Sequence, residues 1–102
     1  MLILPIKKKW FDMIISGQKK EEYRELKPYY RKRFHTIGLL DDYGLPVPGT
    51  QKIVLRNGYS NDSPSVVVHC SIDIKPGKAE WGAELGKDYY VLKIEKIEKY
   101  EG

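Results

Sequence analysis

The chain has 102 residues, of which 41% are hydrophobic and 31% are charged, and its formal net charge is +4. This length fits one domain and leaves little room for a second, so we expect residues 1–102 to form a single domain. The lone cysteine, Cys70, excludes a disulfide framework and a Cys-rich zinc site. No apolar run approaches the ~20 residues that cross a bilayer. The apolar start precedes the first lysines, which is the wrong order for a signal peptide, so the expected location is the cytoplasm.

Basic residues are concentrated in the first third of the chain. Residues 1–34 hold ten basic and four acidic side chains, a net charge of +6, whereas residues 35–102 hold eight and ten, a net charge of −2. This asymmetry indicates an anionic partner such as nucleic acid. A lysine-rich surface that only keeps the chain in solution explains the charge equally well.

Short strands and helices are expected to alternate in the first half of the chain. We expect a strand at 2–6, a helix at 7–16 that stops at a left-handed Gly17, and an extended segment at 21–26. Pro28 is placed to open a second helix over 29–37. Helical spacing puts several apolar side chains on the inner faces of these helices: Trp10, Phe11, Met13, Ile14 and Ile15 in the first, and Tyr30, Phe34 and Ile37 in the second.

Strands dominate the second half. Residues 39–50 form a Gly- and Pro-rich loop, long enough to act as a lid or a mobile flap. Strands are expected at 51–56, before an Asn-Gly turn, and at 65–75, where alternation places Val66, Val68, Cys70, Ile72 and Ile74 on one face. Residues 76–87 are expected to form a turn or one irregular helical turn. A last strand at 88–99 has its alternation broken at Ile97, which predicts a bulge or a twist there.

The order β-α-β-α-β-β-β predicts an α+β fold. Long final strands without helices between them exclude a doubly wound parallel sheet. They favour a small mixed β-barrel flanked by two or more helices.

The segment after the first helix carries an unusual set of charges. If 21–26 is extended, Glu22, Arg24 and Leu26 share one face, and Leu26 makes that face the inward one. A carboxylate and a guanidinium would then lie about 7 Å apart on the concave side, which is costly unless they are paired or used. We expect a polar pocket at the barrel mouth, with an exposed Lys19 at its lip. A structural Glu–Arg pair beside a solvated run of charges is the alternative.

This segment resembles a known signature. Its residues Gly17, Lys19, Glu22 and Arg24 follow the G-x-K-x-x-E-x-R pattern of the ASCH domain, in the PUA-like superfamily. The preceding strand and Trp/Phe-bearing helix are similar to the ASCH amino terminus, and residues 56–59 and 81–84 resemble features of a small bacterial and phage branch. The resemblance covers nearly the whole chain. It implies a PUA-like barrel with a ligand cleft where Lys19, Glu22 and Arg24 meet.

The resemblance also implies a function, because members of the family are generally proposed to bind RNA or modified nucleobases. One similar branch hydrolyses acetylcytidine with a Lys, a Thr nucleophile and a Glu. Lys19 matches that Lys, but the nucleophile's position is Glu22, which cannot replace a hydroxyl. We therefore expect an RNA-binding or modified-nucleotide-binding module. The alternative is a hydrolase of a modified nucleoside or RNA, with Glu22 as general base and Lys19 stabilising negative charge. A protein-interaction domain is a third possibility.

Two further groups of residues suit nucleic acid. Aromatic and basic side chains are interleaved on the second helix, which fits phosphate contacts and base stacking. The candidate nucleic-acid-binding residues there are Tyr29, Arg31, Lys32 and Arg33. A basic amphipathic helix whose aromatic side chains belong to the core explains the same pattern. The second group is expected to hydrogen-bond to a base at the cleft or stack on it, and consists of Arg56, Asn57 and Tyr59. Turn geometry explains the Asn57-Gly58 pair equally well.

No metal site and no cofactor are expected. His69 and Cys70 are adjacent on a strand, so they face opposite sides and cannot serve one metal. His35 stands alone in the sequence, and Cys70 is expected to be an inert core thiol.

Overall fold

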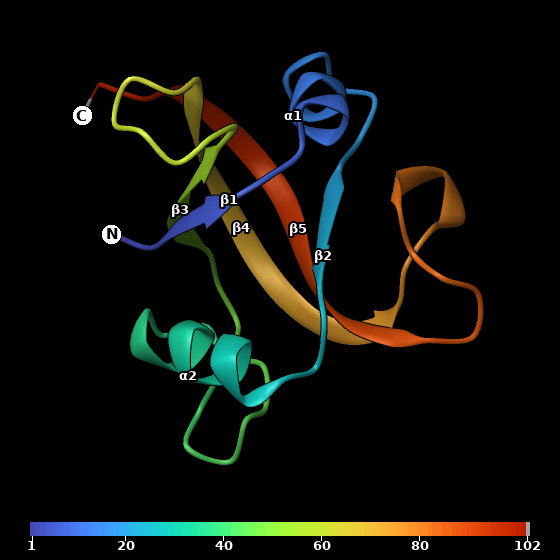
Figure 1. Ribbon diagram of the computed structural model, residues 1–102. Helices are drawn as coiled ribbons and strands as arrows, with labels where there is room; N and C mark the ends of the chain where they lie inside the picture. Colours follow the sequence, from blue (N-terminus) through green and yellow to red (C-terminus); the bar gives the residue numbers. More distant parts are fainter. Residues whose placement is uncertain (102) are drawn as a thin grey trace.

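The computed structural model describes residues 1–101 and contains the strands and helices that the sequence predicts (Figure 1). The first helix is one residue shorter than expected at each end, and Pro28 opens the second helix as expected. The elements in chain order are β1 (Ile3–Pro5), α1 (Lys8–Ile15), β2 (Glu21–Arg24), α2 (Pro28–Thr36), β3 (Gln51–Arg56), β4 (Ser65–Pro76), the 3₁₀ turn η1 (Ala79–Trp81) and β5 (Asp88–Lys99).

The five strands form one curled sheet in the order β1-β3-β4-β5-β2. Only β1 and β3 run parallel, and the other neighbours are antiparallel. The long strands β4 and β5 bend across the molecule, so that the sheet closes into a half-barrel with α1 near one end and α2 near the other (Figure 1). The α+β prediction of a small mixed barrel flanked by helices is confirmed at this level.

The predicted bulge lies in β5. Cys70 pairs with Ile94, whereas the preceding His69 pairs with Lys96, so Glu95 is the extra residue. An extra residue bends a strand and increases its twist. The bulge therefore explains why the alternation fails at Ile97 and helps the sheet to curl.

The core fills the concave side of the half-barrel. The predicted inward residues of β4 pack there against α1 and α2, and Ile14 and Phe34 have no exposed surface. The prediction that Ile15 belongs to the inner face of α1 is wrong, because its side chain is 53% exposed. Ile15 lies about 100° around the helix from Ile14, at the edge of the apolar arc whose centre Ile14 occupies.

The loop 39–50 is anchored at its start. Leu39 and Leu40 are buried in the core, and the Asp41 carboxylate accepts hydrogen bonds from the Tyr43 and Leu45 backbone N–H groups. Tyr43 and Leu45 are exposed at the loop's tip. A lid role for this loop stays a prediction. Within residues 1–101, no helix is long and apolar enough to span a membrane.

Candidate functional site

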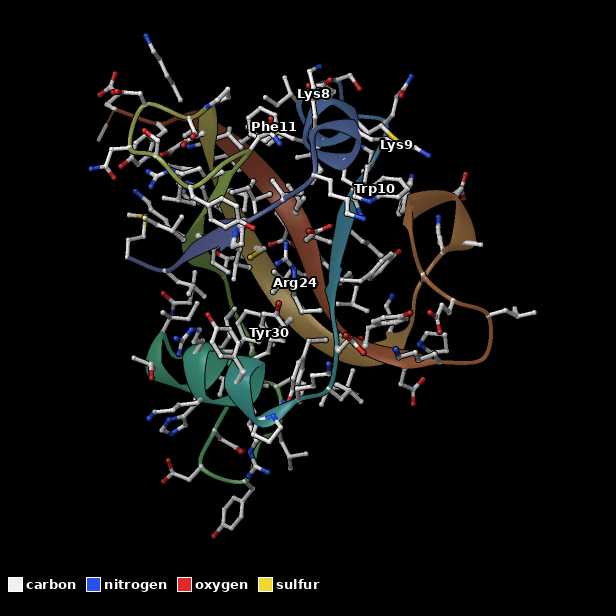
Figure 2. The ribbon with its side chains drawn as sticks, in the orientation of Figure 1. Lys8, Lys9, Trp10, Phe11, Arg24 and Tyr30 are labelled. Atoms are coloured by element: carbon white, nitrogen blue, oxygen red, sulfur yellow. The ribbon has the colours of Figure 1, made fainter. Side chains whose placement is uncertain are left out.

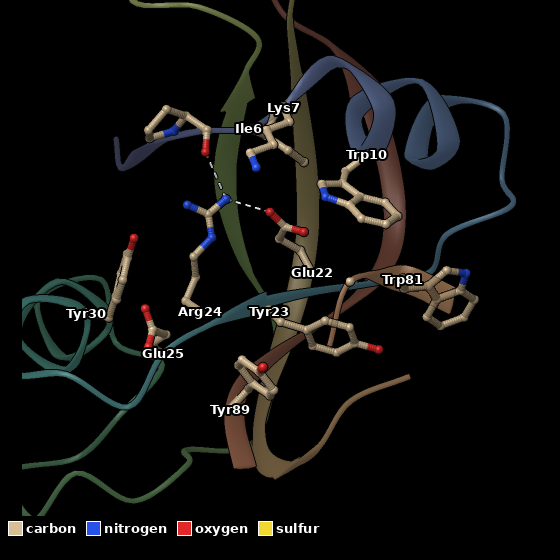
Figure 3. A pocket seen from close by; sticks show the side chains of 12 residues that line it. Ile6, Lys7, Trp10, Glu22, Tyr23, Arg24, Glu25, Tyr30, Trp81 and Tyr89 are labelled. Atoms are coloured by element: carbon tan, nitrogen blue, oxygen red, sulfur yellow. Dashed lines mark hydrogen bonds and ion pairs between the residues drawn. The ribbon is translucent and has the colours of Figure 1, made fainter. Parts of the chain in front are cut away.

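A cleft of about 410 Å³ opens at the mouth of the half-barrel, beside β2. The turn between β1 and α1 forms one side, and η1 forms another (Figure 3). Charged and aromatic side chains dominate the lining, which consists of Pro5, Ile6, Lys7, Trp10, Glu22, Tyr23, Arg24, Glu25, Tyr30, Trp81, Gly82 and Tyr89.

Glu22 is the central charged group of the cleft. Its side chain is 8% exposed, and its Oε1 lies 3.1 Å from Lys19 Nζ while its Oε2 lies 2.5 Å from Arg24 Nη2. In the register of β2 and β5, Glu22 is opposite Leu92 and Arg24 is opposite Tyr90, both of which belong to the core. Because directly opposite residues share a face, the inward orientation expected for Glu22 and Arg24 is confirmed.

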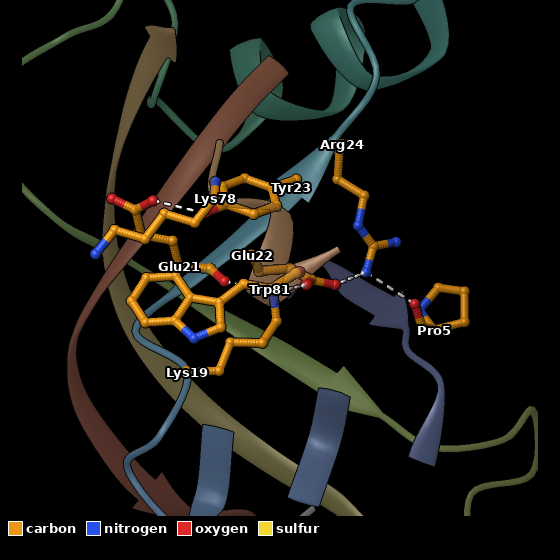
Figure 4. Close-up of polar contacts among 8 residues, drawn as sticks. All are labelled: Pro5, Lys19, Glu21, Glu22, Tyr23, Arg24, Lys78 and Trp81. Carbon is orange, nitrogen blue, oxygen red and sulfur yellow. Dashed lines mark hydrogen bonds and ion pairs between the residues drawn. The ribbon is translucent and has the colours of Figure 1, made fainter. Parts of the chain in front are cut away.

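Lys19 lies under the cleft and not at its lip. Its side chain has no exposed surface, and its ammonium donates to the Glu21 carbonyl at 2.6 Å and the Trp81 carbonyl at 2.9 Å, besides its ion pair with Glu22 (Figure 4). These contacts occupy all three of its donors. Burial lowers the pKa of Lys19, and the neighbouring Glu22 carboxylate opposes that effect.

The prediction that Lys19 is exposed is therefore wrong. After the left-handed Gly17 the chain does not lead away from the helix, because the Lys19 N–H donates to the Met13 carbonyl at 2.9 Å. The side chain is thereby directed between two rings, with its ammonium 5.2 Å from the Trp10 ring centroid and 4.8 Å from that of Tyr23. An aromatic face attracts a cation and excludes water from it.

Arg24 joins β2 to β1. Its Nη2 donates to the Pro5 carbonyl at 2.9 Å as well as to Glu22, and its guanidinium lies 5.9 Å from the Tyr30 ring. Figure 2 shows Arg24 next to Tyr30, between β2 and α2. The prediction that Leu26 continues this face inward is wrong: Leu26 is 46% exposed, because β2 ends at Arg24 and its alternation ends there.

Aromatic rings wall the cleft. Trp10 packs on the bare Cα of Gly82, whose left-handed backbone (φ +102°) would place a Cβ 3.0 Å from the indole. The Tyr23 hydroxyl donates to Glu21 Oε1 at 2.8 Å and accepts from the Lys78 N–H at 2.9 Å, which ties η1 to β2. The walls are therefore fixed before any ligand arrives.

Sequence reasoning missed most of these walls. Trp10 and Tyr30 have the helical spacing of core residues and are partly buried against the core. Helical spacing therefore cannot distinguish a residue that lies in the core from one that lines the cleft. Trp81 comes from a Gly-rich turn, where no periodicity reports its direction. The charges of Glu22 and Arg24 on an inward face were the one local signal of the cleft.

The residues predicted from 56–59 do not line this cleft. Arg56 is buried on the opposite face of β3 from core residue Leu55; its Nε donates to Ser65 Oγ at 2.9 Å, and its guanidinium lies 5.3 Å from the Tyr100 ring. Asn57 and Tyr59 line a second depression beside the cleft. Their ligand-binding role stays a prediction, with Asn57 and Tyr59 placed next to the cleft and Arg56 away from it.

The predicted nucleic-acid-binding residues of α2 lie on the outer side of that helix. Tyr29 is 57% exposed, and the Arg33 guanidinium lies 3.9 Å from its ring centroid. Arg31 packs against Gly44 of the loop, and Lys32 is exposed. Only Tyr30 of this helix reaches the cleft, so the basic helix face forms a separate surface.

The fold and the site define a class: an α+β protein with a curled mixed half-barrel and a charged, aromatic-walled cleft. Comparisons with models of protein families, with curated proteins and with solved structures find none that matches this chain. Among residues 1–101, no group of three or more His, Cys, Asp or Glu side chains is placed to hold a metal ion.

Proposed function

We propose that this protein is a nucleotide-binding module of the ASCH type, in the PUA-like superfamily, which holds one base of an RNA or a modified nucleoside in the cleft. The observation that carries the proposal is the ion-paired Glu22 and Arg24 at the base of a cleft walled by aromatic rings. The signature residues Lys19, Glu22 and Arg24 form one connected cluster, which supports the ASCH assignment.

The chemistry of the cleft suits a base. Every nucleobase has a flat face that stacks on aromatic side chains, for about 1–3 kcal/mol per base. A carboxylate and a guanidinium side by side offer an acceptor and donors to the base edge. Lys7 directs its ammonium toward the cleft (Figure 3), where it would meet a phosphate.

The cluster is also rigid, which favours binding. Lys19 and Arg24 hold both oxygens of Glu22, and Arg24 is itself held by the Pro5 carbonyl. A site whose groups are held in place before binding loses less entropy when a ligand arrives.

The hydrolase alternative finds less support in this geometry. A Lys19 that stabilises charge on a substrate must contact it, yet its ammonium is buried and its donors are used. We therefore favour a binding module and test hydrolysis directly.

Isothermal titration calorimetry with the four ribonucleoside 5′-monophosphates and acetylcytidine tests the proposal. At least one of them is expected to bind, and Trp10→Leu should weaken it by about fivefold or more, since stacking contributes about 1–3 kcal/mol. Tyr43→Leu is the matched control, because Tyr43 is 82% exposed on the distant loop. Absence of binding to the whole panel, or equal loss in both variants, would refute the proposal.

Mass spectrometry of acetylcytidine incubated with the protein separates binding from hydrolysis. We expect no turnover by the wild type. Glu22→Gln keeps an acceptor, so it should retain much of the binding. Deacetylation by the wild type that disappears in Glu22→Gln would replace the binding module by the hydrolase.

A further inference from the structure

Two depressions open on either side of the turn between β1 and α1. The larger is the cleft, and the smaller, of about 310 Å³, is lined by Asn57, Gly58 and Tyr59. Both are also lined by the same three residues of the turn, Pro5, Ile6 and Lys7. The two depressions are therefore neighbours that share one rim.

The smaller depression has a fixed floor. Asn57 Nδ2 donates to the Ile6 carbonyl at 2.9 Å, and its backbone N–H donates to the Pro64 carbonyl at 2.8 Å. Gly58 has a left-handed backbone (φ +129°), and a Cβ there would lie 2.3 Å from Ser63 Oγ. The segment after β3 is thus tied to the turn that follows β1, and only glycine fits at its tightest point.

Tyr59 stands free beside this floor. Its side chain is 93% exposed, so it adds almost nothing to the core. Single exposed aromatic residues are common, but this one lies next to a depression that adjoins the cleft. Its ring is available as a stacking platform for a flat group.

Lys7 supplies a cation at the shared rim. It is exposed and lines both depressions, and within residues 1–101 no hydrogen bond or ion pair holds its ammonium. By contrast, the next residue, Lys8, is paired with Asp12 at 2.5 Å. An anionic group passing from one depression to the other would meet Lys7.

We propose that the two depressions are consecutive nucleotide subsites, and that the ligand is a single-stranded oligonucleotide. One base occupies the cleft, the next base stacks on Tyr59, and the phosphate between them lies at Lys7. This inference rests on the proposed function, since it takes the cleft as the first subsite. Stacking and phosphate contacts tolerate any sequence, so the cleft selects the base and the second subsite adds affinity.

The test compares each ribonucleoside 5′-monophosphate with the dinucleoside monophosphate of the same base by titration calorimetry. The dinucleotide should bind at least about fivefold more tightly, the lower end expected for one additional stacked base. Tyr59→Ala should remove that gain and leave the mononucleotide affinity unchanged. Lys7→Gln should weaken the dinucleotide and lower the salt dependence of its binding by about one phosphate contact.

Two exposed residues serve as controls. Tyr43→Ala removes a comparably exposed ring from the loop 39–50, and Lys20→Gln removes a comparably exposed charge. Neither substitution should change the ratio of the affinity for the dinucleotide to the affinity for the mononucleotide. Melting temperatures within a few degrees of the wild type would show that the variants fold.

The outcomes separate this inference from the proposed function. Mononucleotide binding that depends on Trp10, with no gain for the dinucleotide, would overturn the second subsite alone. A gain that survives Tyr59→Ala but disappears in Lys32→Gln would place the second base at α2 and also overturn it. Failure of every nucleotide to bind would overturn both proposals.

Discussion

Replacing Lys19 by methionine should destabilise the protein strongly. The substitution keeps an unbranched apolar side chain that reaches as far as the Lys19 Cε but removes the ammonium. It leaves the buried Glu22 carboxylate with Arg24 alone, and it leaves the Glu21 and Trp81 carbonyls without this donor.

The magnitude follows from the burial of this pair. Removing one partner of a buried ion pair costs about 3–5 kcal/mol. The retained contact of Glu22 with Arg24 at 2.5 Å puts Lys19→Met near the lower end, about 3 kcal/mol. For a domain of this size, 1 kcal/mol shifts the melting temperature by about 4–8 °C, so a decrease of about 12–24 °C is expected.

Urea denaturation and thermal melting followed by circular dichroism measure this effect. Lys20→Met is the matched control, because Lys20 is exposed and adjacent; it should change the free energy of unfolding by no more than about 0.5 kcal/mol. A Lys19→Met protein as stable as the Lys20→Met protein would show that the buried contacts of the Lys19 ammonium do not stabilise the fold.

Three more outcomes are expected. Burial raises the pKa of the Cys70 thiol from 9.0 to about 12. Above pH 9 the thiol therefore loses its proton in the unfolded chain but keeps it in the native state, so the free energy of unfolding should fall between pH 9 and pH 11. Urea titrations measure this decrease, which should be smaller in Cys70→Val. Tyr23→Phe removes two hydrogen bonds of the hydroxyl, which should cost about 1–2 kcal/mol and speed hydrogen exchange at the Lys78 amide. Replacing Arg31, Lys32 and Arg33 together by glutamine should weaken binding of short RNAs uniformly and lower the slope of log K against log salt by about two.

The order of elements could be predicted because their signals are local. The Asn-Gly turn marks the end of β3, alternation marks the extent of β5 up to its bulge, and Pro28 marks the start of α2. The bulge was visible as one break in the pattern at Ile97, since an extra residue reverses the faces of those that follow it.

The environment of Lys19 could not be predicted from local pattern. One acceptor of its ammonium is the carbonyl of Trp81, 62 residues away in the sequence. Likewise, the position of Arg56 depends on which face of β3 meets the core, and a strand buried on both faces shows no alternation to reveal it. The inward charges of Glu22 and Arg24 predicted a pocket, but its aromatic walls come from α1, α2 and η1.

The most direct test of the proposed function is nuclear magnetic resonance of the ¹⁵N-labelled protein during titration with the nucleotide that binds most tightly. The sequence contains two tryptophans, and both Trp10 and Trp81 line the cleft, so their indole N–H signals report on it separately from the rest of the chain. We predict that both indole signals and the backbone amides of Glu22 and Arg24 shift with one common dissociation constant. Shifts confined to α2 or another surface, with both indole signals unchanged, would contradict the assignment of the cleft as the nucleotide site.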